Sequence, residues 1–242
     1  MLNRPLSFFR AAWSAFADGF YPPTCLGCGR SLWLWRDAFL CAECENNWSW
    51  LNDNGCRRCG EPLGRYAAGV CQRCRTKKPA FTRAIAVAPY REGATDALVK
   101  DFKYHGNRRL AKPLAELLAA RIRRCWSLDE IDWLTAVPLH PDRYAWRGYN
   151  QSWLLVEELA ARLPLPAAAV LRRVRDTPAQ ANLPVEARRQ NLRDAFAATA
   201  PLTGKKILLI DDVLTTGATA NECARALRHA GATRVFVATF AR

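Results

Sequence analysis

The spacing of apolar and polar positions changes near residue 80. Beyond it, short β-branched and apolar runs, which predict strands, alternate with stretches of helical periodicity. The expected strands are Ala84–Tyr90, Trp133–Val137, Lys206–Ile210 and Arg234–Phe240, and the expected helices are Asp96–Arg124 (broken around residues 105–107), Gln151–Arg162 and Ala218–Ala230. This alternation predicts an α/β fold for residues 80–242, a parallel sheet with flanking helices.

The chain before residue 80 contains tryptophans, short Gly- and Pro-punctuated pieces and eight of the ten cysteines, all in C-x-x-C pairs. The pairs are Cys25/Cys28, Cys41/Cys44, Cys56/Cys59 and Cys71/Cys74. Twelve residues separate the first pair from the second, and eleven separate the third pair from the fourth. Two such pairs can present four thiolates to Zn²⁺ at tetrahedral corners. We expect a small double zinc-ribbon module over residues 23–78 that holds one or two structural zinc ions. Tandem pairing is preferred, and pairing of the first pair with the third is the alternative.

Residues 1–22 are predicted to form an amphipathic N-terminal helix. Its apolar stripe consists of Leu6, Phe9, Trp13, Phe16 and Phe20. The stripe is expected to pack on the protein itself, and contact with a membrane surface is the alternative. The regular cysteine pairs and the lack of a secretory signal pattern favour a reducing cytoplasm. Cys125 and Cys223 fall in helical patterns and are expected to act as small buried hydrophobic residues.

The chain is strongly basic, with 36 Lys and Arg against 22 Asp and Glu and a net charge of +14. Eight thiolates and two Zn²⁺ together contribute −4, which lowers the +14 to +10. Such a surplus favours nucleic acid or phosphorylated metabolites as partners, and a basic soluble surface is the alternative. The arginine-rich segment Arg172–Asp194 has no strong periodicity, so we expect a long basic loop that acts as a lid.

The most specific motif begins with four apolar residues, Ile207–Ile210, which predict a strand buried on both faces. Two carboxylates follow at its carboxyl end, where open α/β sheets bind ligands. Carboxylates accept hydrogen bonds from vicinal ribose hydroxyls, and a hydroxyl-rich loop before a helix N-terminus suits a phosphate. The predicted phosphoribosyl site comprises Asp211, Asp212, Thr215, Thr216, Gly217, Ala218 and Thr219.

This string resembles the PRPP-binding signature of type I phosphoribosyltransferases. The cysteine module followed by such a domain resembles the ComF/GntX family, which is linked to natural competence and to the use of DNA as a nutrient. The resemblance implies a type I phosphoribosyltransferase-like fold. It also implies that Asp211 and Asp212 bind the ribose hydroxyls, that Thr215–Thr219 bind the 5-phosphate, and that Mg²⁺ accompanies PRPP.

A second resemblance covers the stretch between Val137-Pro138 and Arg147-Gly148-Tyr149. It looks like a lengthened form of the pyrophosphate loop of the same superfamily. The residues that it assigns to pyrophosphate are Arg143, Arg147 and Gly148. Lys103 resembles part of a Lys-Tyr-x-Gly feature of the family and is expected near the site.

The acceptor base is not indicated. Thr215 stands where hypoxanthine- and guanine-using relatives carry an acid, and Ala145 stands where adenine-using relatives often carry Glu. We favour a PRPP- or nucleotide-binding protein of the ComF/GntX type that serves DNA uptake or utilisation, with other DNA-uptake proteins among its partners. A first alternative is an active phosphoribosyltransferase with an unknown acceptor and unassigned catalytic residues. A second is a zinc-ribbon protein that holds single-stranded DNA by charge and by stacking on Trp48 and Trp50.

Overall fold

The structure is a computed structural model that describes residues 24–32, 38–64, 69–90, 93–175 and 192–242. The predicted N-terminal helix, residues 1–22, and residues 176–191 of the predicted lid lie outside the described residues. Within the described ranges, no helix is both long and apolar enough to span a bilayer.

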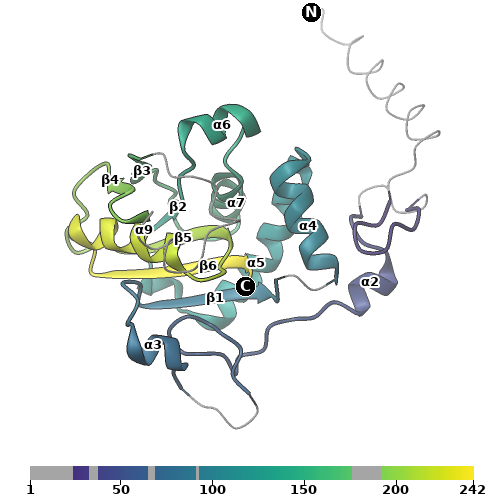
Figure 1. Cartoon of the computed structure of the whole chain (residues 1–242), viewed down its shortest axis with the longest axis horizontal. Coiled ribbons are helices and arrows are strands. Elements are labelled where there is room, and N and C mark those ends of the chain that lie inside the picture. Colours follow the sequence, from purple (N-terminus) through teal and green to yellow (C-terminus); the bar gives the residue numbers. More distant parts are fainter. Residues whose placement is uncertain (1–23, 33–37, 65–68, 91–92, 176–191) are drawn as a thin grey trace, which may run out of the picture.

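A four-stranded parallel sheet forms the centre of the molecule (Figure 1). Its strands, in spatial order, are β1 (Arg83–Ala88), β6 (Arg234–Ala241), β5 (Lys206–Val213) and β2 (Trp133–Ala136). All three neighbouring pairs run parallel. The predicted α/β architecture and each predicted strand are confirmed, with strand ends that differ by a few residues.

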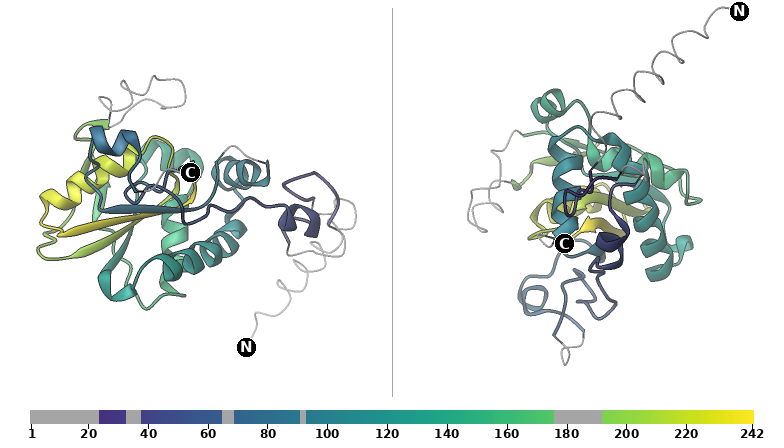
Figure 2. Two further views of the ribbon diagram at one scale, coloured as in Figure 1. Left: turned by 90° about the horizontal axis from the view of Figure 1, so that it is seen from below. Right: turned by 90° about the vertical axis from the view of Figure 1, so that its right-hand side faces the viewer.

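Helices cover both faces of this sheet (Figures 1 and 2). One face carries α4 (Gly93–Tyr104), α5 (Ala111–Cys125) and α7 (Gln151–Ala160). The other carries α9 (Ala218–His229) and the antiparallel pair β3 (Leu171–Arg173) and β4 (Phe196–Ala198). The shorter helices are η1 (Arg108–Leu110), η2 (Leu128–Glu130) and α6 (Pro141–Arg147).

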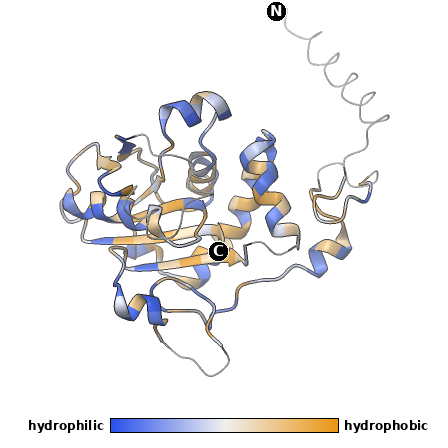
Figure 3. Ribbon diagram, viewed as in Figure 1, coloured by the Kyte–Doolittle hydropathy of each residue, from blue (hydrophilic) through white to orange (hydrophobic). Residues whose placement is uncertain are grey.

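Strand β5 contributes to both halves of the core. Ile207 and Leu209 pack with the α9 side, and Leu208 and Ile210 pack with the α5 and α7 side. All four are fully buried. Successive side chains of a strand point to opposite faces, so their burial means that both faces of β5 are covered. Figure 3 shows the same pattern, with apolar strands at the centre and hydrophilic stretches on the outlying helices α3 and α6. The predicted strand buried on both faces is confirmed.

The two cysteine-rich ribbons lie apart from each other, and each packs on a different face of the core (Figure 1). The first, which contains α2 (Ala42–Asn46), contacts the α4 and α5 side through Leu32 and Leu40. The second, which contains α3 (Gln72–Thr76), contacts the α9 side through its buried cysteines. The linker after α3 leads directly into β1.

The tryptophans beside the first ribbon pack against the larger domain. Trp48 packs edge-on against Phe240 of β6, with ring centroids 5.7 Å apart, and its Nε1 donates to Thr95 Oγ1 of α4 at 2.9 Å. Trp50 stacks on Trp48 and stays 54% exposed. These contacts attach the first ribbon to the larger domain.

The predicted basic loop begins later than the sequence indicates. Arg172 and Arg173 belong to β3, which pairs with β4 after the loop. Strand β3 shows no apolar run in the sequence, because two of its three residues are arginines and only Leu171 is buried.

Candidate phosphoribosyl site and zinc centres

The acidic pair lies at the carboxyl end of the central strand β5. The strand does not end before the acids, as the sequence suggested, but continues through them to Val213, with Asp211 opposite Thr239 of β6. The backbone at both acids is therefore held in a sheet ladder. Asp212 is 4% exposed, and Asp211 is partly buried.

Lys103, at the end of α4, reaches this pair. Its Nζ lies 2.9 Å from Asp212 Oδ1, and the two side chains are 18% and 5% exposed. The second carboxylate oxygen of Asp212 is buried and has no hydrogen-bond partner among the described residues. Burial would lower the pKa of Lys103, but the carboxylates of Asp212 and Asp211 outweigh it and raise this pKa, so Lys103 is a cation at neutral pH. The expectation that Lys103 lies near the acids is met.

Asp211 is held by two donors that fix its orientation. Ser152 Oγ donates to Asp211 Oδ1 at 2.9 Å, and the backbone N–H of Asp212 donates to the same oxygen at 3.0 Å. Burial and the neighbouring charge of Asp212 raise the pKa of Asp211 to about 7, against the opposing effect of Lys103 and Ser152. Asp211 therefore changes charge near neutral pH.

Ser152 is a residue of the candidate site that the sequence did not identify. It lies in the first turn of α7, whose N-cap Asn150 accepts from the Ser152 and Trp153 N–H groups and donates from Nδ2 to Val137 O at 3.0 Å. The cap therefore ties the start of α7 to the end of β2. An Asn three residues before Trp153 signals a helix start, but it does not reveal which residue of that turn faces Asp211.

The predicted phosphate loop connects β5 to α9. Gly217 is the N-cap of α9 with a φ of 76°, a left-handed conformation that favours glycine, and Thr216 Oγ1 accepts from the Ala218 N–H at 3.3 Å. Thr215 is exposed, and Thr219 lies in the first turn of α9. The loop thus brings the hydroxyls and helix N-terminus expected of a phosphate site to the edge of the sheet that carries the acids.

The predicted pyrophosphate loop contains a helix, α6, instead of an extended loop. Pro141 occupies its first turn, the His140 side chain caps its N-terminus, and Gly148 ends it with a φ of 77°. Arg143 and Arg147 therefore project from a helix. Arg147 donates to Gln151 Oε1 at 2.5 Å and lies 5.4 Å from the Tyr104 ring centroid, which places it beside the residue after Lys103.

A buried contact joins the end of α4 to the start of α7. The Tyr149 hydroxyl donates to the carbonyl of Phe102, one residue before Lys103. Arg108 lies 4.8 Å from the Tyr149 ring centroid and donates to Gly148 O at 2.9 Å. These contacts position Lys103, and no local pattern signals them, because the partners lie 40 and 47 residues apart in the sequence.

Eight cysteines form two separate four-sulfur clusters. The clusters are Cys25/Cys28/Cys41/Cys44 and Cys56/Cys59/Cys71/Cys74, and within each the sulfur atoms lie within 4.8 Å of one another. The Sγ atoms of Cys28 and Cys41 lie 3.7 Å apart, as do those of Cys59 and Cys71. A tetrahedron with Zn–S bonds of about 2.3 Å has edges of about 3.8 Å, so both clusters fit Zn²⁺. Tandem pairing is thereby established, and the interleaved alternative is excluded.

The protonation of the thiols also fits a metal. Burial opposes ionisation of Cys25, but backbone N–H groups of Cys41, Cys28 and Gly27 lower its pKa to about 6. Burial and the neighbouring thiols raise the pKa of Cys44 to about 12. Four thiolates in this space repel one another, and a divalent cation removes that repulsion. The residues of both clusters therefore fit structural zinc.

Cys223 and Cys125 lie outside these clusters. Cys223 is fully buried in α9, as expected, whereas Cys125 at the end of α5 is only partly buried.

Known proteins share this combination of parts. A family described as "Double zinc ribbon domain" matches residues 16–75, and one described as "Phosphoribosyl transferase domain" matches residues 150–242. The chain is 36% identical over 186 residues to the DNA utilization protein YhgH of Salmonella typhi, covering 75% of this chain and 81% of that protein. It is 30% identical over 230 residues to competence protein F of Haemophilus influenzae, covering 92% of this chain and 98% of that protein.

The chain belongs to the ComF/GntX family. Among solved structures, this ComF/GntX chain is similar to the glutamine PRPP amidotransferase from B. subtilis. The two are 24% identical, with a TM-score of 0.38, and the match covers 57% of this chain and 30% of that chain. The assignment of the phosphoribosyltransferase-like fold depends on the family match and the parallel sheet.

Proposed function

We propose that this ComF/GntX protein binds PRPP or a nucleotide through its ribose 5-phosphate and that this binding serves the uptake of DNA or its use as a nutrient. The single observation that carries the proposal is the fixed group of Asp211, Asp212, Lys103 and Ser152, which lies beside the loop that starts α9. The relatives named for competence and for DNA utilisation supply the second half of the proposal.

Each part of the site has a matching group on the ligand. The carboxylates of Asp211 and Asp212 accept hydrogen bonds from the 2- and 3-hydroxyls of the ribose. The N–H groups and hydroxyls of residues 215–219 bind the 5-phosphate, with help from the helix dipole. PRPP would bind together with Mg²⁺, which would offset part of the negative charge of its pyrophosphate.

Lys103 and the arginines of α6 are suited to the pyrophosphate end of PRPP. In the free protein Lys103 is paired with Asp212, and Arg147 is paired with Gln151. The negative charge of a pyrophosphate on this side would be attracted by Lys103 and by the arginines of α6, and this attraction would stabilise the complex. We place this function in the reducing cytoplasm, where thiolate–zinc centres persist.

The proposal is tested by ligand competition in the zinc-loaded protein. Ribose 5-phosphate, PRPP with Mg²⁺ and pyrophosphate alone are titrated separately and then against one another. We expect ribose 5-phosphate to displace PRPP, because both fill the same diol and phosphate positions. If pyrophosphate alone competes as strongly as PRPP while ribose 5-phosphate does not compete, the ribose assignment is wrong.

Turnover is a separate question with its own assay. Release of pyrophosphate from PRPP is measured with adenine, guanine, hypoxanthine, uracil and without a base. Binding without release in every case supports a binding protein, and base-dependent release supports the enzyme alternative. In that reaction the bond from C1 of PRPP to the pyrophosphate oxygen would break, a bond from C1 to the acceptor nitrogen would form, and pyrophosphate and the proton of that nitrogen would be released.

A further inference from the structure

The start of the phosphate loop, residues 215–217, is tied to the end of β6. The backbone N–H of Leu214, the residue before the loop, donates to Ala241 O at 2.9 Å. The next residue, Arg242, turns its side chain to the second zinc ribbon, where its Nη2 pairs with Glu61 and donates to Cys59 Sγ at 3.4 Å. Cys59 is one of the four cysteines of that zinc centre. A short chain of contacts therefore joins the zinc centre to the start of the loop.

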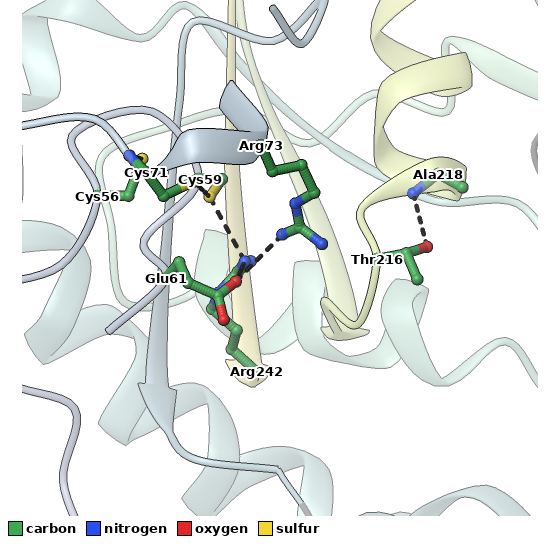
Figure 4. Close-up of polar contacts among 8 residues, drawn as sticks. All are labelled: Cys56, Cys59, Glu61, Cys71, Arg73, Thr216, Ala218 and Arg242. Atoms are coloured by element: carbon green, nitrogen blue, oxygen red, sulfur yellow. Dashed lines mark hydrogen bonds and ion pairs between the residues drawn. The ribbon is translucent and has the colours of Figure 1, made fainter. Parts of the chain in front are cut away.

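The side chain of Arg242 depends on the second ribbon for its balance of charge. It is 4% exposed and cannot lose its proton, so Glu61 and the zinc-bound thiolates are what compensate its buried charge. A donor to a ligating sulfur also fixes the orientation of that sulfur. Figure 4 shows these contacts, and Thr216 and Ala218 line the same cavity as Cys59 and Arg242. The ribbon and the loop thus face each other across one space.

The end of the phosphate loop is tied to the linker that follows the second ribbon. The Ala80 N–H donates to Asn221 Oδ1 at 2.8 Å, and the Asn221 N–H donates to Gly217 O at 2.9 Å. Phe81 is buried, and a Cβ added to Gly217 would lie 3.9 Å from its ring. The linker leaves directly from α3, which carries the ligand cysteine Cys74. Both ends of the loop therefore lead to the second zinc centre.

The first zinc ribbon reaches the site by a less direct route. Its attachment runs through Trp48, which donates to Thr95 at the start of α4, eight residues before Lys103. The end of α4 is held separately, because the Tyr149 hydroxyl donates to Phe102 O. Loss of the first ribbon should therefore leave both Lys103 and the phosphate loop in place.

We propose that the second zinc centre positions the phosphate loop, so that tight binding of PRPP requires zinc in the second ribbon and not in the first. Structural zinc supplies much of the folding free energy of so small a module. Without it, Arg242 and the linker lose their anchor, and the loop spends less time in the geometry that binds a phosphate. Affinity falls in proportion to that fraction. The inference rests on the proposed PRPP function, but the coupling of ribbon and loop can be measured without a ligand.

Two matched variants of the full chain, Cys41→Ser and Cys71→Ser, remove one zinc centre each. The two cysteines hold equivalent places, since each is the N-cap of a five-residue helix and each N–H donates to the first cysteine of its cluster, Cys25 or Cys56. Serine is a favourable N-cap, so neither short helix loses its cap. Zinc content is measured by atomic emission, and each variant should retain about one ion per chain.

Mg²⁺–PRPP is titrated into each protein by calorimetry. We expect Cys41→Ser to match the wild type and Cys71→Ser to bind about 10-fold or more weakly, as follows if the binding geometry falls to about a tenth of the population. Asn221→Ala keeps both zinc centres and removes only the tie to Ala80. It should weaken binding by about 3–10-fold, which tests the coupling even if Cys71→Ser does not fold.

Hydrogen exchange without ligand, followed by mass spectrometry, reports on the loop itself. Peptides over residues 213–221 should exchange faster in Cys71→Ser and in Asn221→Ala than in the wild type or in Cys41→Ser. The proposal is overturned if these peptides exchange alike in all four proteins, or if PRPP binds Cys71→Ser and Asn221→Ala as tightly as Cys41→Ser. If the wild type binds no PRPP but the exchange rates differ as expected, the proposed PRPP function fails and the positioning of the loop by the second ribbon stands.

Discussion

Replacement of Lys103 by Met tests how much the ion pair between Lys103 and Asp212 stabilises the folded protein. Lys103 Nζ lies 2.9 Å from Asp212 Oδ1, and the acid is 5% exposed in its side chain. Removal of the lysine leaves a buried carboxylate whose other oxygen already lacks a partner among the described residues. Breaking a buried pair from one side costs about 3–5 kcal/mol. Because Lys103 is 18% exposed, we expect a loss at the lower end, about 3 kcal/mol of unfolding free energy.

The assay is urea unfolding of the zinc-saturated protein followed by tryptophan fluorescence, with thermal unfolding in parallel. A loss of about 3 kcal/mol corresponds to a Tm lower by roughly 6–12 °C in a domain of this size. Lys100→Met is the matched control on the same helix. Lys100 pairs with Asp96 at 2.7 Å, but its side chain is 58% exposed, so its loss should cost under about 0.5 kcal/mol.

A double-mutant cycle isolates the pair itself. Asp212→Asn alone should cost less than Lys103→Met, because the partly exposed ammonium can still reach water. The double variant Lys103→Met/Asp212→Asn should be no less stable than Lys103→Met, with a coupling energy of about 2 kcal/mol or more. A coupling energy near zero, or equal losses for Lys103→Met and Lys100→Met, would refute the reasoning.

Three further predictions concern the acids and the zinc centres. Cys28→Ser should lower the zinc content from two ions to about one per chain, measured by atomic emission, whereas Cys125→Ser should leave it unchanged. Ser152→Ala removes a donor to Asp211 and should weaken PRPP binding by about 3–10-fold, with little change in Tm. Because the pKa of Asp211 is raised to about 7, Asp211 is protonated below that pH and ionised above it, so PRPP affinity should rise between pH 6 and pH 8. Asp211→Asn should remove this part of the pH dependence, and a profile unchanged by that substitution would contradict the titration of Asp211.

The sheet and the acids were predictable because their signals are local. Ile207–Ile210 are apolar without interruption, which occurs when both faces of a strand are covered, and Asp211 and Asp212 follow directly. The spacing of the eight cysteines predicted a double zinc ribbon. In each case a few neighbouring residues carry the whole pattern.

The contacts that complete the site depend on long-range packing. Lys103 reaches Asp212 only because α4 ends beside the carboxyl edge of β5, and Ser152 faces Asp211 only because Asn150 ties α7 to β2. Helix α6 was not predicted, because its residues are mostly exposed and form no apolar stripe. The local features that favour this helix are the caps at its two ends, His140 and Gly148. The contact of Trp48 with Phe240 joins residues almost 200 positions apart, so no local pattern in the sequence predicts it.

The most direct test of the phosphoribosyl site is calorimetric titration of Mg²⁺–PRPP into the zinc-loaded wild type and into Asp211→Asn/Asp212→Asn, with zinc content measured on the same samples. We expect a single PRPP-binding site in the wild type and at least about 100-fold weaker binding in the variant, with both zinc ions retained in each protein. Unchanged PRPP affinity in a folded, zinc-loaded variant, or no binding by the wild type, would contradict it.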